Sequence, residues 1–212
     1  MTEAEWLVCA DPRPMLGHLG RVSPRKVRLL TCACCRRAWD LLTDERSRRA
    51  VEVAERFADG TANGEELLAA QRGAQAAYRL ARKRHEPFRL FVAAAMAVDA
   101  AARRAKFDPT TEFLRGAKDR KDRTERAARA ALCRDLFGNP FRPVALDRRW
   151  LAGDALRLAR AIYAERRFDH LPVLADALED AGCADPAVLD HCRRPAEHVP
   201  GCWVLDLLLG KS

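Results

Sequence analysis

Hydrophobic positions recur with helical spacing along nearly the whole chain. Within residues 23–42, for example, one helical face carries Val27, Leu30, Cys34, Ala38 and Leu41. Ser23 stands where an N-cap is expected and Pro24 takes the first helical position. No segment combines strand length, strict alternation and flanking turns. The pattern predicts an all-α protein, a compact multi-helix domain of about eight to ten short helices.

Capping residues divide the N-terminal half into separate helices. Thr2 and Glu5 are spaced as a capping box for a short first helix. Asp44 is the expected cap of a helix that ends at Gly60. Alanine-rich helices are predicted over 64–84 and 87–106.

Similar signals organise the C-terminal half. A helix is predicted from about 122 to 137, followed by one that Asp147 caps and that runs through Trp150, Leu156 and Ile162. The remaining predicted helices run from Asp169 to Gly182, from Asp185 and Pro186 over a short stretch, and over 200–209.

One polar, weakly periodic stretch interrupts the helical pattern. We expect an N-terminal helical region over 1–107, a basic loop or linker over 108–123, and a C-terminal helical region over 124–212, as parts of one integrated domain. A chain of 212 residues is long enough to bury a substantial core.

Positive charge is concentrated in the middle of this basic chain. The formal net charge is +8, and residues 103–149 hold 14 basic and 7 acidic side chains, a net of +7. Residues 169–190 carry six carboxylates and no Lys or Arg. Of the 38 basic residues 32 are arginine, a bias that a GC-rich genome also produces without functional meaning.

The basic segment is a candidate for binding nucleic-acid phosphates. Its candidate contacts are Arg115, Lys118, Arg120, Lys121, Arg123, Arg126 and Arg129. No helix-turn-helix, zinc-finger or RNA-binding signature accompanies the charge, and aromatic residues are not interleaved with it. The alternative is a solvated helix face.

Neither a secretory signal nor a membrane span is predicted. The first residues are acidic and lack a basic region, and the longest apolar run, residues 90–98, falls far short of the roughly 20 residues that a span requires. We therefore expect a cytoplasmic protein that does not engage membranes. Its eight cysteines are then expected to be thiols or metal ligands rather than disulfides.

Known catalytic motifs are missing from the sequence. It contains no HExxH, P-loop, GxGxxG or GxSxG pattern, and no catalytic residue is predicted. The four tryptophans lie in predicted helices and are interpreted as core anchors.

Cysteines cluster first in the sequence TCACCRR. Cys32 and Cys35 are three residues apart and share one side of a helix, which suits two metal ligands but not the four that zinc requires. The favoured interpretation is that the small thiols of Cys32, Cys34 and Cys35 fill a tight helix crossing.

A second cluster near the C-terminus is the sharper candidate for chemistry. It consists of Cys183, His191, Cys192, His198 and Cys202, and Cys/His mixtures suit zinc. A helix beginning near 198 would place His198 and Cys202 on one face. The alternative is that the histidines cap helix ends while the cysteines pack beneath Trp203. No cofactor other than zinc is suggested.

Two long blocks resemble a protein family associated with planctomycete bacteria. The first contains CACCRR, and the second contains GNPFRPV, LADALEDAGC and HCRRPAEHVPGCWVLDLLLG. The resemblance spans most of the chain and is weakest over 64–130. It implies a bacterial, cytoplasmic protein and no particular activity, cofactor or catalytic residue.

These observations favour a non-enzymatic interaction or adaptor module that binds a protein partner. One alternative is a nucleic-acid-binding accessory protein that uses residues 103–149, and a second is a zinc-stabilised helical domain.

Overall fold

The structure is a computed structural model that describes residues 1–86, 88–102, 120–151 and 153–211. Within these ranges it contains eleven α-helices, ten of them with seven residues or more, and no strand. The predicted all-α fold is confirmed.

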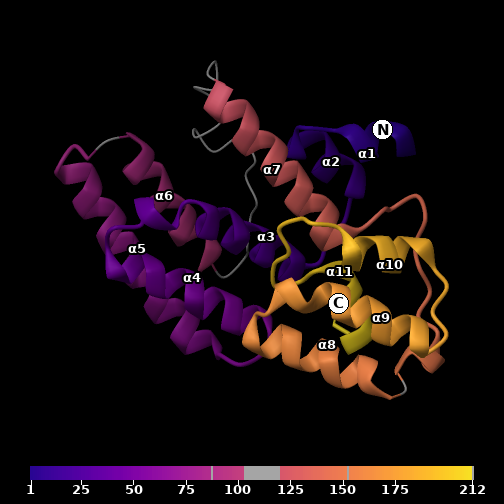
Figure 1. Cartoon of the computed structure of the whole chain (residues 1–212). Coiled ribbons are helices and arrows are strands. Elements are labelled where there is room, and N and C mark those ends of the chain that lie inside the picture. The colour runs from indigo at the N-terminus through magenta and orange to yellow at the C-terminus, as the bar shows by residue number, and fades with distance from the viewer. Residues whose placement is uncertain (87, 103–119, 152, 212) are drawn as a thin grey trace. The chain divides into compact units, whose positions relative to one another are not determined.

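The eleven helices of the described residues are labelled in chain order (Figure 1). Their bounds are Glu3–Val8 (α1), Pro12–Leu19 (α2), Pro24–Arg37 (α3), Glu45–Ala58 (α4), Gly64–Lys83 (α5), Phe88–Ala100 (α6), Arg120–Phe137 (α7), Asp154–Glu165 (α8), Leu171–Asp180 (α9), Pro186–Arg193 (α10) and Trp203–Leu209 (α11). Short 3-10 helices lie at Trp39–Leu41, Arg148–Leu151 and Phe168–His170.

Predicted caps form the expected hydrogen bonds. The Thr2 and Glu5 side chains each accept the other residue's backbone N–H, at 3.3 and 2.7 Å. The side chains of Ser23, Asp44 and Asp185 accept backbone N–H groups in the first turns of α3, α4 and α10. These bonds satisfy donors that have no partner within the helix, and they fix where each helix begins.

Several helix boundaries differ from the prediction. The helix expected from Asp147 through Ile162 is broken by Gly153, whose φ of +63° does not fit an α-helix, and α8 starts only after it. Residues 200–202 precede α11 instead of belonging to it. A helix that the pattern missed, α2, begins with Asp11 as its cap and Pro12 at its first position.

The chain divides into two units. One comprises Cys9–Ala130, and the other comprises Ala131–Ser212 together with Met1–Val8. The division passes through α7, and most of the predicted linker 108–123 lies outside the described residues. We describe each unit separately.

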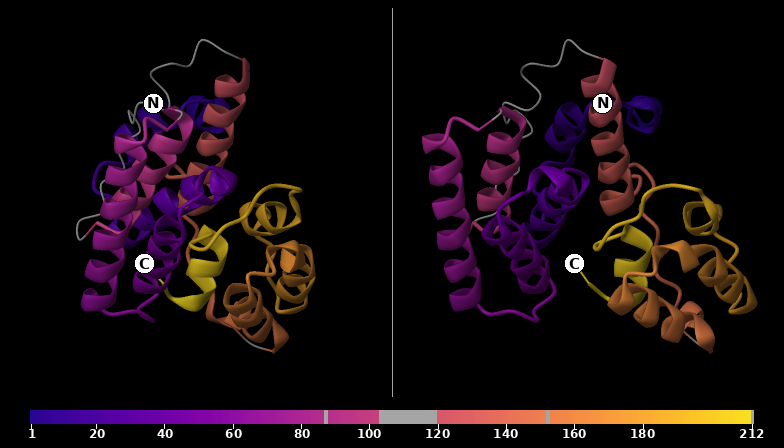
Figure 2. Two further views of the ribbon diagram at one scale, coloured as in Figure 1. Left: turned by 90° about the vertical axis from the view of Figure 1, so that its left-hand side faces the viewer. Right: turned by 60° about the vertical axis from the view of Figure 1, so that its left-hand side comes forward.

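In the first unit, helices α3 to α6 pack against one another (Figure 2). Alanines on their facing sides are fully or almost fully buried, which allows the helices to approach closely. The buried Arg28 donates to the carbonyls of Ala100 and Ala102, at 2.7 and 2.8 Å, and so satisfies acceptors at the end of α6. Glu55, also buried, forms a two-point ion pair with Arg36.

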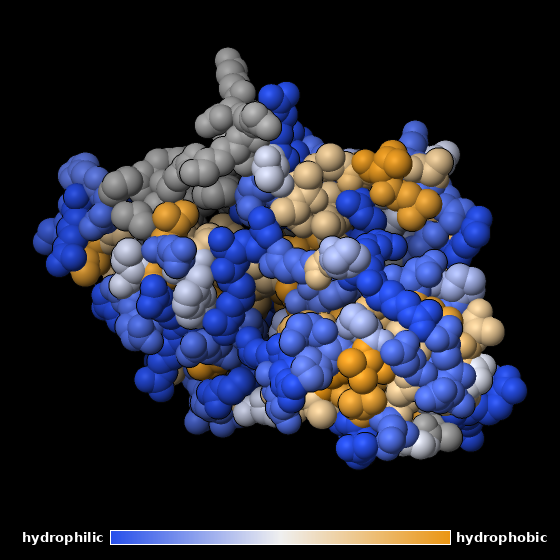
Figure 3. All heavy atoms as spheres, in the orientation of Figure 1, coloured by the Kyte–Doolittle hydropathy of each residue, from blue (hydrophilic) through white to orange (hydrophobic). Residues whose placement is uncertain are grey.

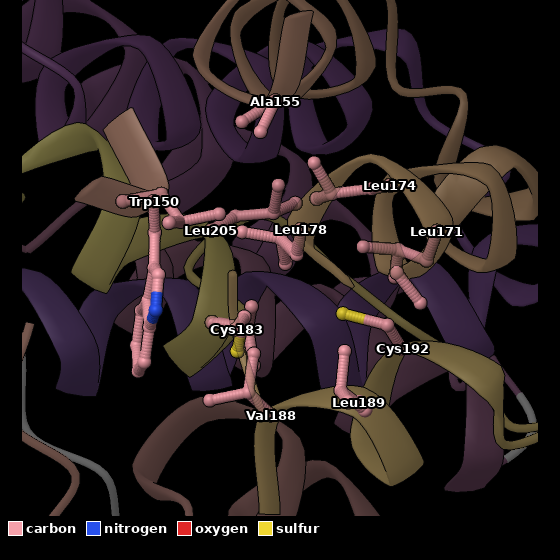
Figure 4. Packing of buried hydrophobic residues seen from close by; sticks show 14 of the residues in the cluster. Trp150, Ala155, Leu171, Leu174, Leu178, Cys183, Val188, Leu189, Cys192 and Leu205 are labelled. Atoms are coloured by element: carbon pink, nitrogen blue, oxygen red, sulfur yellow. The ribbon is translucent and has the colours of Figure 1, made fainter. Parts of the chain in front are cut away.

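The second unit has its own apolar core, formed by helices α8 to α11 and the 3-10 turn before α8 (Figure 1). Leu171, Leu174 and Leu178 extend from α9 into this core, to which Leu205 of α11 also belongs (Figure 4). Trp6 of α1 also belongs to this unit: its indole N–H donates to the carbonyl of Gly138 at 3.0 Å, and Arg134 donates to the carbonyl of Trp6.

A candidate metal centre

Four side chains with metal-binding atoms converge inside the second unit. They are Asp135, His191, His198 and Cys202, and one potential ligand atom from each lies within 4.8 Å of the others. Asp135 and Cys202 are buried, and the side chains of His191 and His198 are 10% and 5% exposed. This buried group, hereafter the Asp–His–His–Cys cluster, can hold a metal ion.

Asp135 is the centre of the hydrogen-bond network. Its Oδ1 lies 2.6 Å from His198 Nδ1 and 3.3 Å from His191 Nε2, and its Oδ2 accepts the backbone N–H of Val199 at 3.1 Å. Burial alone would raise the pKa of the carboxyl, but the hydrogen bonds from the two imidazoles outweigh it and lower the pKa. Asp135 is therefore ionised and able to bind a cation.

His191 connects the cluster to Trp203. Its Nε2 lies 3.1 Å from Cys202 Sγ, and its Nδ1 accepts the indole N–H of Trp203 at 3.0 Å. Burial lowers the pKa of His191 despite the neighbouring carboxylate. The imidazole is therefore neutral near pH 7, the form that binds metals.

One buried nitrogen of the cluster has no hydrogen-bond partner. His198 uses Nδ1 for Asp135, which leaves Nε2 inside the protein without a donor or acceptor among the described residues. Unsatisfied buried polar atoms are rare and costly. Because Nδ1 is the His198 nitrogen beside Asp135, a metal ion held by the cluster would bind Nδ1, and the unpartnered Nε2 does not by itself point to a metal.

The loop before α11 positions His198 and Cys202, the two cluster residues that come last in sequence. Gly201 has a backbone φ of +92°, a conformation that residues other than glycine rarely adopt. The turn at Pro200 and Gly201 allows His198 and Cys202 to face Asp135 from a non-helical segment. The prediction of a helix beginning near 198 is wrong, although the two residues do meet.

The donor set suits a tetrahedral metal, and two separations between its ligand atoms come close to the spacing that such a metal requires. Zinc bonds of 2.0–2.3 Å place tetrahedral ligand atoms about 3.3–3.7 Å apart. The separations of His191 Nε2 from Asp135 Oδ1 and from Cys202 Sγ, 3.3 and 3.1 Å, are close to this range. The 2.6 Å contact of His198 with Asp135 would have to lengthen by less than about 1 Å. Burial raises the pKa of Cys202, so its thiol loses its proton only if a cation is present.

Two of the five predicted ligands lie elsewhere. Cys183 and Cys192 are buried among Val188, Leu189 and Leu178 in the apolar core (Figure 4). Burial raises the pKa of Cys192 to about 12, as expected for a thiol in such surroundings. Adjacent residues on a helix point about 100° apart, so His191 and Cys192 cannot both face the cluster.

Asp135 was not predicted as a ligand. It lies 56 residues before His191 in sequence, near the end of α7, and no short motif joins it to the histidines. The available signal was a single acidic residue within the apolar run from Ala130 to Phe137, where a carboxylate needs a partner to be buried.

The α3 cysteines form no comparable site. Cys32, Cys34 and Cys35 are 1–2% exposed, and the Asp–His–His–Cys cluster is the only group of three or more potential ligands within the described residues. Burial is the main cause of the raised pKa of Cys35. Their burial agrees with the interpretation that these thiols fill a helix crossing.

The proposed nucleic-acid contacts are only partly described. Arg115 and Lys118 lie outside the described residues, and Arg120 and Lys121 begin α7. Arg123 is exposed, whereas the Arg126 side chain is 25% exposed and lies 3.9 Å from Asp11. Arg129 is 2% exposed and ion-paired with Glu125, so it is not available to phosphates as the sequence pattern suggested.

No described helix has both the length and the apolar character needed to cross a membrane. The chain matches no protein-family model, no curated protein and no solved structure.

Proposed function

We propose that the unit formed by residues 131–212 and 1–8 is a zinc-stabilised helical domain. The observation that carries this proposal is the convergence of one carboxylate, two imidazoles and one thiol in a buried site. Zinc is the metal that this set suits best, because it accepts nitrogen, sulfur and oxygen ligands in tetrahedral geometry.

The proposed role of the metal is structural. Four protein ligands fill a tetrahedral shell and leave no open position for a substrate or a catalytic water. The ligands come from α7, from α10 and from the loop that leads into α11. A metal there would fasten these three segments together, and its binding energy would add to the stability of the folded unit.

Elemental analysis with matched variants tests the proposal. Protein purified without chelator or a metal-affinity step should contain about one zinc per chain, and EDTA should lower its thermal midpoint. Cys202→Ser and His198→Gln should lose zinc. Cys183→Ala and Cys192→Ala are the matched controls, because they remove buried thiols of the same unit that lie outside the cluster.

Two results would contradict the structural zinc site. The first is a zinc content well below one equivalent with no effect of EDTA on stability. The second is zinc loss that is equal in the Cys192→Ala and Cys202→Ser proteins, because it would reflect unfolding rather than removal of a ligand.

A second candidate function is protein binding without catalysis. Leu7 and Val8 of α1 are 53% and 81% exposed, and hydrophobic patches over this helix interrupt a mainly hydrophilic face (Figure 3). Leu7 also lines a pocket of about 410 Å³ whose walls include Trp6, Trp203 and Arg194. Exposed apolar side chains beside such a pocket are typical of a surface that a partner covers.

Substitutions at this surface test the binding proposal. Leu7→Glu with Val8→Glu should abolish recovery of any specific partner that co-purifies from the native host. Val173→Glu is the control, since Val173 is a 51% exposed apolar residue on α9. Loss of the partner in the control alone would place the binding surface elsewhere.

A further inference from the structure

The Trp203 side chain determines where His191 carries its proton. An indole N–H can only donate a hydrogen bond, so the His191 Nδ1 that lies 3.0 Å from it must be the acceptor. A neutral imidazole has one protonated nitrogen. The proton of His191 is therefore on Nε2 in the structure as it stands.

That same Nε2 faces the centre of the cluster. It lies 3.1 Å from Cys202 Sγ and 3.3 Å from Asp135 Oδ1, which makes it the ligand atom of His191. A metal needs the unshared electron pair of Nε2 and therefore displaces its proton. A metal-bound histidine carries its proton on the other ring nitrogen and donates it to an acceptor. At His191 that nitrogen meets the N–H of Trp203, so two donors would face each other.

The packing around Trp203 resists a simple rearrangement. A Cβ built on Gly138 would lie only 3.2 Å from the Trp203 ring, so this backbone already approaches the indole closely. The imidazole of His191 meets the indole edge to face, with ring centroids 5.2 Å apart. The indole cannot turn its N–H away without moving against these neighbours.

We propose that Trp203 is a positioning residue that weakens metal binding by holding His191 in the metal-free proton arrangement. The inference deepens the proposed zinc site and rests on it. Loading of Zn²⁺ transfers the His191 proton from Nε2 to Nδ1 by exchange with water and breaks the Trp203 hydrogen bond. In the same step the Cys202 thiol releases its proton to solvent, and the His198 nitrogen that binds the metal gives up any proton that it carries.

The same contact links the metal to the protein surface. Trp203 and His191 both line the 410 Å³ pocket that also contains Trp6 and Arg194. The opposition of two donors that metal loading creates therefore falls on two residues of that pocket's wall.

Trp203→Phe is the decisive variant because phenylalanine keeps an aromatic ring and lacks the N–H. Zinc affinity, measured by competition with a chelator of known affinity, should rise about tenfold in this variant, which corresponds to about 1.4 kcal/mol. The metal-free variant should unfold at a lower urea concentration, because it has lost a hydrogen bond. Opposite changes in metal-free stability and metal affinity are expected, whereas a merely structural residue would lower both.

Trp150→Phe is the matched control, since Trp150 is a buried tryptophan in the core of the same unit. It should lower stability and leave zinc affinity unchanged. In the wild-type protein, histidine ¹⁵N spectra should show the His191 proton on Nε2 before zinc is added and on Nδ1 afterwards.

The outcomes separate the inference from the proposed function. If wild-type protein binds zinc and Trp203→Phe binds it equally or more weakly, the role of Trp203 is wrong and the zinc site stands. If the wild-type protein binds no zinc, both the proposed zinc site and the proposed role of Trp203 are wrong. A proton that stays on Nε2 in the zinc-loaded protein also overturns the role of Trp203.

Discussion

Two cysteine-rich segments of this protein have opposite chemical characters. On α3, Cys32, Cys34 and Cys35 lie within one helical turn and are buried. Near the C-terminus, Cys202 meets two imidazoles and a carboxylate. The denser cysteine cluster in sequence is the inert one. A ligand site depends on polar atoms that arrive from different elements, because one helical turn cannot surround an ion.

Among the substitutions that test this difference between the two segments, replacement of Asp135 should cause the largest loss of unfolding free energy. Asp135→Ala leaves two imidazoles and the Val199 N–H without their buried acceptor. We expect a loss of about 3–5 kcal/mol in the unfolding free energy of chelator-treated protein. Urea titration measures it, and Asp169→Ala is the control, because the Asp169 side chain is 78% exposed. A loss below about 1 kcal/mol would show that the network is not stabilising.

A substitution on α3 should give a smaller and chemically different effect. Cys35→Ser places a hydroxyl in a buried site and should cost about 1–3 kcal/mol. Its zinc content should equal that of the wild-type protein, because Cys35 is not part of the cluster. If Cys35→Ser lost zinc while remaining folded, the distinction between the two segments would be wrong.

Acidification should weaken the C-terminal cluster before it affects α3. Burial lowers the pKa of His191 below its ordinary value of 6.5, so below that pH the unfolded chain binds a proton that the folded chain does not. Stability is therefore present above about pH 6.5 and falls as the pH decreases. The lowered pKa of Asp135 extends the loss to the region below its ordinary value of 3.8.

Urea unfolding of chelator-treated protein at a series of pH values measures this dependence. His191→Asn should flatten the fall that begins near pH 6.5, whereas His18→Asn should retain it, because His18 lies outside the cluster. An unchanged slope in His191→Asn would assign the acid sensitivity to another group.

Thiol labelling should show the smallest effect, but it distinguishes the cysteines of the two segments individually. Cys9 is partly exposed and the other seven cysteines are buried. One thiol per native chain should react rapidly with a thiol reagent. Removal of zinc with EDTA should accelerate labelling at Cys202 and leave Cys32, Cys34 and Cys35 unchanged, as peptide mapping would reveal. Equal acceleration at α3 would indicate global loosening.

Local signals explain why most of the fold was predictable. Ser23, Asp44 and Asp185 mark helix starts through bonds to residues two or three positions ahead, so sequence spacing contains the whole interaction. The break at Gly153 was missed because the apolar pattern continues across it. Only the backbone φ of +63° distinguishes this glycine from one that a helix tolerates.

The candidate site was predictable only in part, for a related reason. His191, His198 and Cys202 lie within twelve residues, and their types alone suggested a metal. Asp135 reaches the cluster because α7 packs beside it, and no rule of sequence spacing predicts that packing. Cys183 and Cys192 fit the composition of a zinc site equally well, but they lie on the apolar sides of their segments.

The position of α1 has a consequence for the order in which the protein is made. Trp6 is fully buried and donates to Gly138, so the first eight residues complete a unit whose other members begin at Ala131. At synthesis rates of about 5–20 residues per second, the ribosome releases this segment on the order of ten seconds before its packing partners exist. Trp6, Leu7 and Val8 remain available to chaperones during that interval. The segment that contains Trp6 is synthesised long before Ala131–Ser212, and it reaches its native contacts only once they exist.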